Sequence, residues 1–306
     1  MLLLVLVWLV LVWDGLELMN AIIAAATGYS AGDLQPFLDS VERTCPHSRL
    51  FLIVFKRDSE RVERLSARYP FIEAVYDNYK PKRGIRLSKW IARHFIGQDY
   101  SNCHPLWRSV GTYLLHITLK RYFLALRILR ESCGSFANLL LTDSRDVLLQ
   151  EDPFDRIGDG LVSGVEEKTI GDCPHNSYWI EQIYGPAVLS RMSHRKIVCS
   201  GVTIGPVYKM EPYLVAMCAE MWKHLARAAA SPYFDQGIHN YLIYGKRVPL
   251  ELSENPAGII ATLFYEDRSN IQTDVATGRL VVRGMLPAIV HQYDRHADLA
   301  TFVRQR

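Results

Sequence analysis

The segment LLLTDSRDVLLQEDPFD, residues 139–155, joins an apolar run to two acids and then to an Asp-Pro-Phe turn. The apolar run that ends at Thr142 has the length and composition of a buried strand. Asp143 and Asp146 follow it directly, three residues apart. In open α/β sheets, ligands bind beyond the carboxyl ends of the strands, where loops carry polar groups. The segment therefore predicts a strand that ends at a ligand site.

The two acids are also informative about the ligand. Neighbouring carboxylates repel each other unless a cation lies between them. Asp143 and Asp146 therefore suit part of a site for Mg²⁺ or Mn²⁺, which would keep open positions for phosphate oxygens. The alternative is a turn in which Asp143 caps a backbone group and Asp146 pairs with an arginine. Because D-x-x-D is a common pattern, the spacing by itself slightly favours the turn.

The rest of the chain alternates between strand-like and helix-like patterns. Apolar runs of strand length are Ile22–Ala26, Arg49–Phe55 and Phe71–Tyr76. Helices are expected from a cap at Asp33, over Ser59–Tyr69, and as one long stretch over Pro105–Glu131. Apolar residues recur in that stretch at spacings typical of one helix face. Continuous apolar strands separated by helices predict an α/β fold with a mostly parallel sheet covered on both faces.

Residues 21–306 contain no internal repeat, low-complexity tract or linker, so we expect a single domain. Residues 1–20 are a distinct apolar leader. The uncharged run Leu2–Trp13 is too short to span a bilayer, which needs about 20 residues. No Lys or Arg precedes Arg43, so the basic region of a signal peptide is missing. A partial anchor, a mis-assigned start and an apolar segment packed on the domain stay open, as do membrane association and a secretory or Golgi-type location.

Composition and charge exclude some classes of protein. The chain has 306 residues, 49% of them hydrophobic and 22% charged, as in ordinary globular proteins. Its net charge of +3 is too small to indicate a nucleic-acid partner. The basic stretch Lys80–Arg93 lacks the aromatic interleaving of single-strand binders, and it is only a weak hint of a diphosphate, an anionic acceptor or a membrane surface. The six cysteines show no metal spacing and are expected to be buried free thiols.

Four segments, in order, resemble the motifs of GT-A-fold glycosyltransferases, which belong to the nucleotide-diphospho-sugar transferases. Residues 139–155 resemble the acid motif, although the sequence has D-S-R-D where the family has D-x-D. CSGVTIGP (Cys199–Pro206) resembles the glycine-containing loop before a long helix. FDQGIHNYLIY (Phe234–Tyr244) resembles the Asp-Gln…Asn segment near the sugar and the acceptor, and AIVHQYDRH (Ala288–His296) resembles the C-terminal histidine segment. The resemblance spans nearly the whole chain after the leader.

This resemblance implies a GT-A-like mixed, mostly parallel sheet flanked by helices, with a Rossmann-like nucleotide-binding half. It implies a metal-dependent transferase that uses a UDP- or GDP-sugar, Mn²⁺ or Mg²⁺, and a glycan, lipid or small-molecule acceptor. The expected metal ligands are Asp146, Asp143 and His291, with Asp143 also near the ribose or a bound water. The simpler interpretation of His291 is a hydrogen bond at the end of a strand.

The resemblance further assigns residues to the nucleotide. Thr27, Gly28 and Tyr29 follow the first strand, where Gly28 permits close backbone approach and Tyr29 could stack on uracil. Arg121 matches the arginine on the helix before the acid motif, and Arg145 would face the diphosphate. The alternatives are an ordinary turn for Thr27, Gly28 and Tyr29, a place on a solvated helix face for Arg121, and a structural ion pair for Arg145.

The chemistry is assigned to Asp235 and Gln236, close to the anomeric carbon. A carboxylate there is a general base in an inverting enzyme, whereas in a retaining enzyme an acid or amide stabilises the developing cation or forms an adduct. Asp235 could instead start the following helix as its cap. Gly201 and Asn240 are expected near the sugar or the acceptor. Both stereochemical outcomes stay open.

Three other functions remain as alternatives. A sugar-1-phosphate nucleotidyltransferase would show a glycine-rich basic loop after the first strand, whereas ATGYSAGD contains no Lys or Arg. A catalytically silent protein that binds a nucleotide or sugar on the same fold fits the sequence, but the presence of all the expected site acids and His291 argues against it. A purely structural role leaves the ordered motifs unexplained.

Overall fold

The computed structural model describes residues 18–77, 100, 104–113, 115–132, 134–228, 233–255 and 257–305. Its central sheet has seven strands in the order β3-β2-β1-β4-β7-β6-β8. These strands are β1 (Met19–Ala25), β2 (Arg49–Phe55), β3 (Ile72–Asp77), β4 (Phe136–Asp143), β6 (Val162–Thr169), β7 (Lys196–Pro206) and β8 (Glu251–Ser253). Strands β3, β2, β1 and β4 pair in parallel, whereas β7 is antiparallel to β4 and β6. The predicted α/β fold with a mixed, mostly parallel sheet is confirmed.

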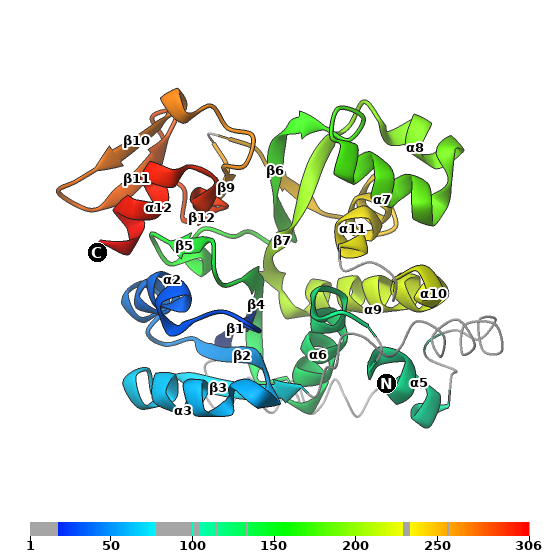
Figure 1. Ribbon diagram of the computed structural model, residues 1–306, viewed down its shortest axis with the longest axis horizontal. Coiled ribbons are helices and arrows are strands. Elements are labelled where there is room, and N and C mark those ends of the chain that lie inside the picture. Colours follow the sequence, from blue (N-terminus) through cyan, green and yellow to red (C-terminus); the bar gives the residue numbers. More distant parts are fainter. Residues whose placement is uncertain are drawn as a thin grey trace.

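Helices pack on both faces of this sheet (Figure 1). They include α2 (Ala31–Thr44), α3 (Ser59–Arg68), α6 (Ile117–Glu131) and α9 (Val207–Lys223). Side chains alternate along β1, so that Ile22 and Ala24 join the core under α2 and α3, while Ala21 and Ile23 join the core under α6 and α9. Because both faces are buried, the central parts of β1, β2 and β4 are continuous apolar runs, which is the pattern that the sequence displays.

The prediction of one long helix over Pro105–Glu131 is wrong in one respect, because the chain forms two helices there. Helix α5 covers Pro105–Tyr113 and α6 begins at Ile117. His116 has extended backbone angles, and its ring nitrogen accepts a hydrogen bond from the Thr118 backbone N–H, which makes it the N-cap of α6. The apolar spacing continues through the break, with Val110 of α5 partly buried against the same core as α6, so periodicity alone does not reveal it.

Helix α2 also begins earlier than expected. Ser30, and not Asp33, is its N-cap. The Asp33 backbone N–H donates to the Ser30 hydroxyl oxygen at 3.2 Å, and the Ser30 backbone N–H donates to the Asp33 carboxylate at 3.0 Å. This reciprocal capping box fixes the start of the helix two residues before Asp33.

A smaller sheet brings the C-terminal part of the chain back onto the acid segment. Its strand order is β5-β12-β9. The hairpin β10–β11 and helix α12 lie beside it (orange to red in Figure 1). The bounds are β5 (Val147–Leu149), β9 (Ile260–Thr262), β10 (Ile271–Asp274), β11 (Arg279–Val282), β12 (Ile289–His291) and α12 (Ala297–Arg304). Strand β12 runs antiparallel to β5, with His291 paired with Val147. This register places the end of β12 beside the connection between β4 and β5.

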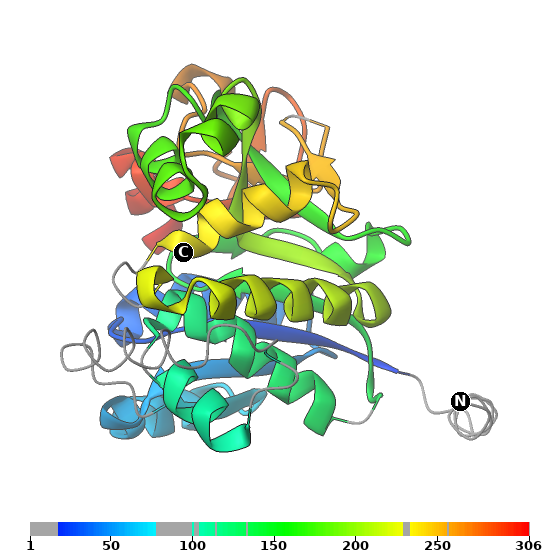
Figure 2. The same cartoon turned by 90° about the vertical axis from the view of Figure 1, so that its right-hand side faces the viewer.

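Helices α7, α8 and α11 pack on the other side of β6 and β7 from this small sheet (Figure 1). Figure 2 shows α11 above α9, which runs along the central sheet. The remaining elements are α7 (Pro174–Tyr184), α8 (Pro186–Met192), α10 (Leu225–Ala228), α11 (Phe234–Tyr244) and the 3₁₀ helices η1 (Lys56–Asp58), η2 (Pro153–Asp155), η3 (Arg268–Asn270) and η4 (Tyr293–Arg295). The Asp-Pro-Phe turn of the acid segment forms η2, whose N-cap is Asp152.

Some expectations fall on residues outside this description. Residues 1–17 of the expected leader and the basic stretch 80–93 are among them, and β1 begins at Met19, within the span assigned to the leader. None of the helices formed by the described residues is both long and apolar enough to cross a membrane. Cys45, Cys173, Cys199 and Cys218 are buried free thiols, as predicted.

Candidate active site

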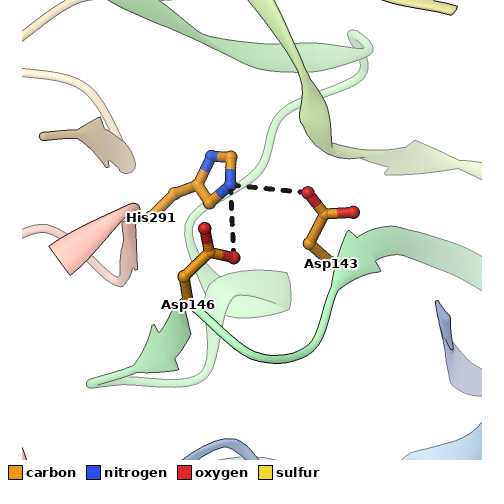
Figure 3. Close-up of side chains that lie close together, drawn as sticks. All are labelled: Asp143, Asp146 and His291. Atoms are coloured by element: carbon orange, nitrogen blue, oxygen red, sulfur yellow. Dashed lines mark ion pairs between the residues drawn. The ribbon is translucent and has the colours of Figure 1, made fainter. Parts of the chain in front are cut away.

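Three side chains from distant parts of the chain meet at the carboxyl end of β4 (Figure 3). Asp143 is the last residue of β4, Asp146 directly precedes β5, and His291 ends β12. One ligand atom from each of them lies within 4.8 Å of the others. The β5–β12 register explains the arrangement, because it sets His291 opposite Val147 and therefore next to Asp146.

The His291 ring is oriented by its surroundings. Its Nε2 lies 3.7 Å from Asp143 Oδ2 and 3.8 Å from Asp146 Oδ1. This nitrogen is buried, and among the described residues it has no hydrogen-bond partner. The other ring nitrogen, Nδ1, lies 3.6 Å from the Cys199 sulfur. A proton on Nδ1 would leave the Nε2 lone pair directed between the two carboxylates, which is the arrangement of a metal-binding imidazole.

Gly201 forms the wall behind this cluster. A Cβ atom at this position would lie 2.3 Å from His291 Cε1 and 2.8 Å from Asp143 Oδ2. Any other residue would therefore displace one of these side chains. The expectation of a loop at Cys199–Pro206 is wrong, since the segment is part of β7, and strand alternation turns Cys199 and Gly201 to the same face.

The two acids of the cluster differ in their electrostatics. Burial opposes ionisation of Asp143, but the charge of Arg121, with a smaller contribution from His291 when its ring is protonated, outweighs burial and lowers the pKa of this carboxyl to about 2. Burial raises the pKa of Asp146, and the neighbouring Asp143 raises it further. Two carboxylates and one imidazole nitrogen are oxygen and nitrogen donors that suit a divalent cation. The cluster could therefore hold a metal ion, and the buried Nε2 without a partner fits that use.

Arg121 joins the cluster to a third acid. It is 3% exposed, so the alternative of a solvated helix face is wrong. Its guanidinium forms ion pairs with Asp143 and, at 3.1 Å, with Asp235 on α11. It also donates to the Ser200 carbonyl oxygen at 2.9 Å. Arg121 therefore fixes β4, β7 and α11 relative to one another at the site.

A cavity of about 500 Å³ opens beside these residues. Besides Asp143, Asp146, His291, Arg121 and Asp235, the residues that line it include charged or polar groups and aromatic rings. The main ones are Tyr29, Arg145, Glu166, His175, Trp179, Gln236 and Tyr265. It is large enough for part of a substrate of sugar-nucleotide size.

Comparison with known proteins bears on the fold. The sequence matches no protein-family model and none of the curated proteins. A solved structure, that of the galactosyltransferase LgtC in complex with donor and acceptor sugar analogues, matches with a TM-score of 0.50 and 13% identity, over 93% of this chain and 95% of that chain. The match therefore spans both the N-terminal and the C-terminal halves of the chain. The chain has a GT-A fold.

Within this GT-A fold, the expected nucleotide residues separate into two groups. Tyr29 and Arg145 line the cavity, and the Arg145 guanidinium lies 5.6 Å from the centroid of the Tyr29 ring. Arg145 also forms a 2.7 Å ion pair with Asp294, so it is held in place without a ligand. Thr27 and Gly28 are not among the described residues that line the cavity. Gly28 has a φ of 80° at the turn after β1, a conformation that favours glycine.

The residues expected from the Asp-Gln…Asn segment all lie on α11, but they point to different places. Asp235 lies in the first turn and Tyr233 is the N-cap, so the alternative of an Asp235 cap is wrong. Burial, only partly offset by Arg121, raises the pKa of Asp235 to about 6. Gln236 lines the cavity. Asn240 does not, because its amide is bonded to the Val198 backbone N–H and carbonyl and to the Gln236 carbonyl.

Several cavity residues were not expected from the sequence. Glu166 on β6 is 4% exposed, and burial raises its pKa. His175 and Trp179 on α7 stack with ring centroids 5.9 Å apart. The segment around them was expected to be a polar loop, and only the observed helix α7 gives their spacing of four residues its meaning, since it sets two rings on one face. The sequence contains no signal for Glu166, because an acid in a strand that contains both polar and apolar residues has no local signature.

Proposed function

We propose that this chain is a metal-dependent glycosyltransferase that moves a sugar from a UDP- or GDP-sugar to a hydroxyl of a glycan, a lipid or a small molecule. The single observation that carries the proposal is the buried His291 Nε2 that faces Asp143 and Asp146 at the end of β4 in a GT-A fold. A structure with this fold that contains donor and acceptor sugar analogues supports the assignment of substrate class.

Asp143, Asp146 and His291 would hold Mn²⁺ or Mg²⁺, whose charge stabilises the diphosphate as the sugar leaves. Arg145 and Arg295 line the same cavity and add positive charge beside the acids. Charge that acts on the leaving group favours the transition state over the ground state, because the negative charge of the diphosphate grows as the bond breaks. Arg121 is already neutralised by two acids, so its role is to hold Asp143 and Asp235 in position.

The two ends of the cavity suit different parts of the substrates. Tyr29 offers an aromatic face for the base on the side of β1. Trp179 and Tyr233, with ring centroids 6.0 Å apart, offer apolar faces for a sugar ring on the side of α7 and α11. Asp235 lines the same cavity. With a pKa of about 6, its carboxyl group would be ionised in most molecules at neutral pH, as a general base or a cation-stabilising group requires.

Calorimetry of UDP and GDP binding, with and without Mn²⁺, tests this function. We expect binding of one nucleotide that requires the metal and that is lost in Asp146→Ala. Asp159→Ala is the matched control, because Asp159 is exposed and contacts Lys209 outside the cavity. Metal-dependent binding that persists in Asp146→Ala would move the metal to another acid, Asp143 first. A folded protein that binds neither nucleotide would contradict the donor assignment and favour a catalytically silent scaffold.

A further inference from the structure

The Gln236 side chain has only one orientation that satisfies its neighbours. The Ser200 backbone N–H lies 2.8 Å from Gln236 Oε1. A backbone N–H can only donate, so the amide atom that faces it is the oxygen and not the nitrogen. The nitrogen Nε2 then faces Glu166 Oε1 at 3.2 Å, and a carboxylate oxygen accepts that hydrogen bond. Both ends of the amide are therefore assigned by groups of fixed character.

This orientation leaves the amide oxygen without free lone pairs. Gln236 Oε1 accepts from the Ser200 N–H and from the Ser200 hydroxyl, each at 2.8 Å. Ser200 lies within β7, which is an inner strand of the central sheet, so the anchor is rigid. The amide nitrogen still has a second N–H. Gln236 can therefore donate a hydrogen bond to a ligand in the cavity, but its oxygen is not free to attack an anomeric carbon.

Glu166 differs from the other acids at the site. Asp143 and Asp235 pair with Arg121, and Asp146 lies 3.8 Å from Arg295. Glu166 forms no ion pair with any described residue, and besides its hydrogen-bond partners the longer-range charges of His291 and Arg295 act on it. A buried carboxyl group without a cation is unfavourable unless hydrogen bonds satisfy it. The Gln236 amide supplies one such bond and leaves the carboxyl bordering the cavity.

We propose that Glu166 is the positioning residue of the transfer site, which together with Ser200 locks Gln236 as a hydrogen-bond donor to a sugar hydroxyl. A hydroxyl group both accepts and donates, and it therefore matches an amide N–H and a carboxylate oxygen side by side. Glu166 and Gln236 thus form a subsite for one hydroxyl of the transferred sugar or of a sugar acceptor, and Gln236 forms no covalent bond to the sugar. This inference rests on the proposed transferase function.

Steady-state kinetics of two Glu166 variants test the positioning role. Glu166→Gln keeps an oxygen that can accept from Gln236 but loses the charge of the carboxylate, so we expect it to retain more of kcat than Glu166→Ala does. Glu166→Ala removes the acceptor that orients the Gln236 amide nitrogen, and misplacement of such a group lowers kcat by about 100-fold. The affinity for the nucleotide stays unchanged in both variants, since neither touches the metal ligands. Glu167→Gln is the matched control, because Glu167 is the next residue on β6 and pairs with Lys196. A normal kcat in Glu166→Ala would overturn the proposal.

Intact-protein mass spectrometry of Gln236→Glu tests the donor role of the amide. A carboxylate is a stronger nucleophile than an amide, so a nucleophile at this position would accumulate a covalent adduct of one sugar mass after incubation with the donor. We expect no adduct, and we expect a large loss of turnover because the new carboxylate repels Glu166. Detection of the adduct would show that the side chain at position 236 reaches the anomeric carbon and not a hydroxyl, and it would overturn the proposal.

A melting experiment separates this inference from the proposed function. The melting temperatures of Glu166→Ala, Gln236→Ala and the double variant form a double-mutant cycle. If the two side chains are hydrogen-bonded to each other, the melting temperature of the double variant should fall by less than the sum of the two single decreases. Coupling without turnover by the parent chain on any UDP- or GDP-sugar would contradict the transferase function and retain the Glu166–Gln236 pairing. Turnover together with additive losses would overturn the pairing and retain the transferase function.

Discussion

His291 is paired with Val147 across the antiparallel strands β12 and β5, so the C-terminal histidine stands beside the acid segment. The backbone continues this contact, because the Gln292 N–H donates to the Asp146 carbonyl oxygen at 2.7 Å. The ligand cluster is thus held by strand pairing and not by side-chain packing alone. Such anchoring on strands fixes a site more tightly than loops do.

Gly201→Ala should weaken metal-dependent nucleotide binding without unfolding the protein. The added methyl would lie 2.3 Å from the His291 ring, which must then move away from the two acids. Loss of a neighbour that orients a metal ligand typically lowers metal affinity by about 10- to 100-fold, and Gly201 is such a neighbour of His291. Titration of Mn²⁺ measures the change. Gly32→Ala is the control, because a Cβ there meets only Ser30 Oγ at 3.9 Å. Unchanged Mn²⁺ affinity in Gly201→Ala would show that the cluster is not the metal site.

Arg121→Met should destabilise the fold by about 3 kcal/mol, because it leaves two acids at the site without their shared cation. Chemical denaturation measures the loss. The companion variant Arg121→Met with Asp235→Asn removes one of the stranded charges, so it should recover part of the stability. Arg127→Met, on the same helix, is the control, since Arg127 is 52% exposed and should change stability little. Equal effects of both arginine substitutions would contradict the structural role of Arg121.

His239 should make stability depend on pH. Burial lowers its pKa to about 3, from an unfolded value of 6.5. The unfolded chain therefore binds a proton as pH falls below 6.5 while the folded chain does not, so stability is lost toward acid. Between pH 6.5 and pH 5 the loss from this residue is at most about 2 kcal/mol. Denaturation of His239→Gln should show a shallower slope in this range. The exposed His194→Gln should keep the parent slope, and an unchanged slope in His239→Gln would refute the assignment.

The sequence was sufficient for the sheet and for the acid segment, because both are local signals. The run that ends at Thr142 is apolar at every position, and β4 does end at Asp143. The break between α5 and α6 was not predictable from spacing, because it depends on the His116 ring, which replaces a usual cap residue. Helix propensity and apolar period are unaffected by such a cap.

The finer arrangement of the site depends on contacts between distant elements. Gln236 and Asn240 are both side-chain amides on α11, one helical turn apart. The Asn240 amide bonds only within the protein, to the β7 backbone and to α11, whereas Gln236 also borders the cavity. The Gln236 orientation in turn depends on a backbone N–H of β7. No spacing rule reports which of two amides on one helix also borders the cavity, so only the packed structure distinguishes them.

Protonation of Asp235 should cause the loss of activity at acidic pH, which is the acid limb of the pH profile. Its pKa is raised to about 6, so the carboxylate fraction, and with it kcat/KM, should rise as pH increases through 6. Asp235→Asn keeps the shape of the side chain but does not ionise, and it should lower kcat by about 100-fold and remove this limb. Nucleotide affinity, measured by calorimetry, should remain close to that of the parent chain, because Arg121 still pairs with Asp143. An acid limb that persists near pH 6 in Asp235→Asn would assign it to another group, with Glu166 the next buried acid at the cavity.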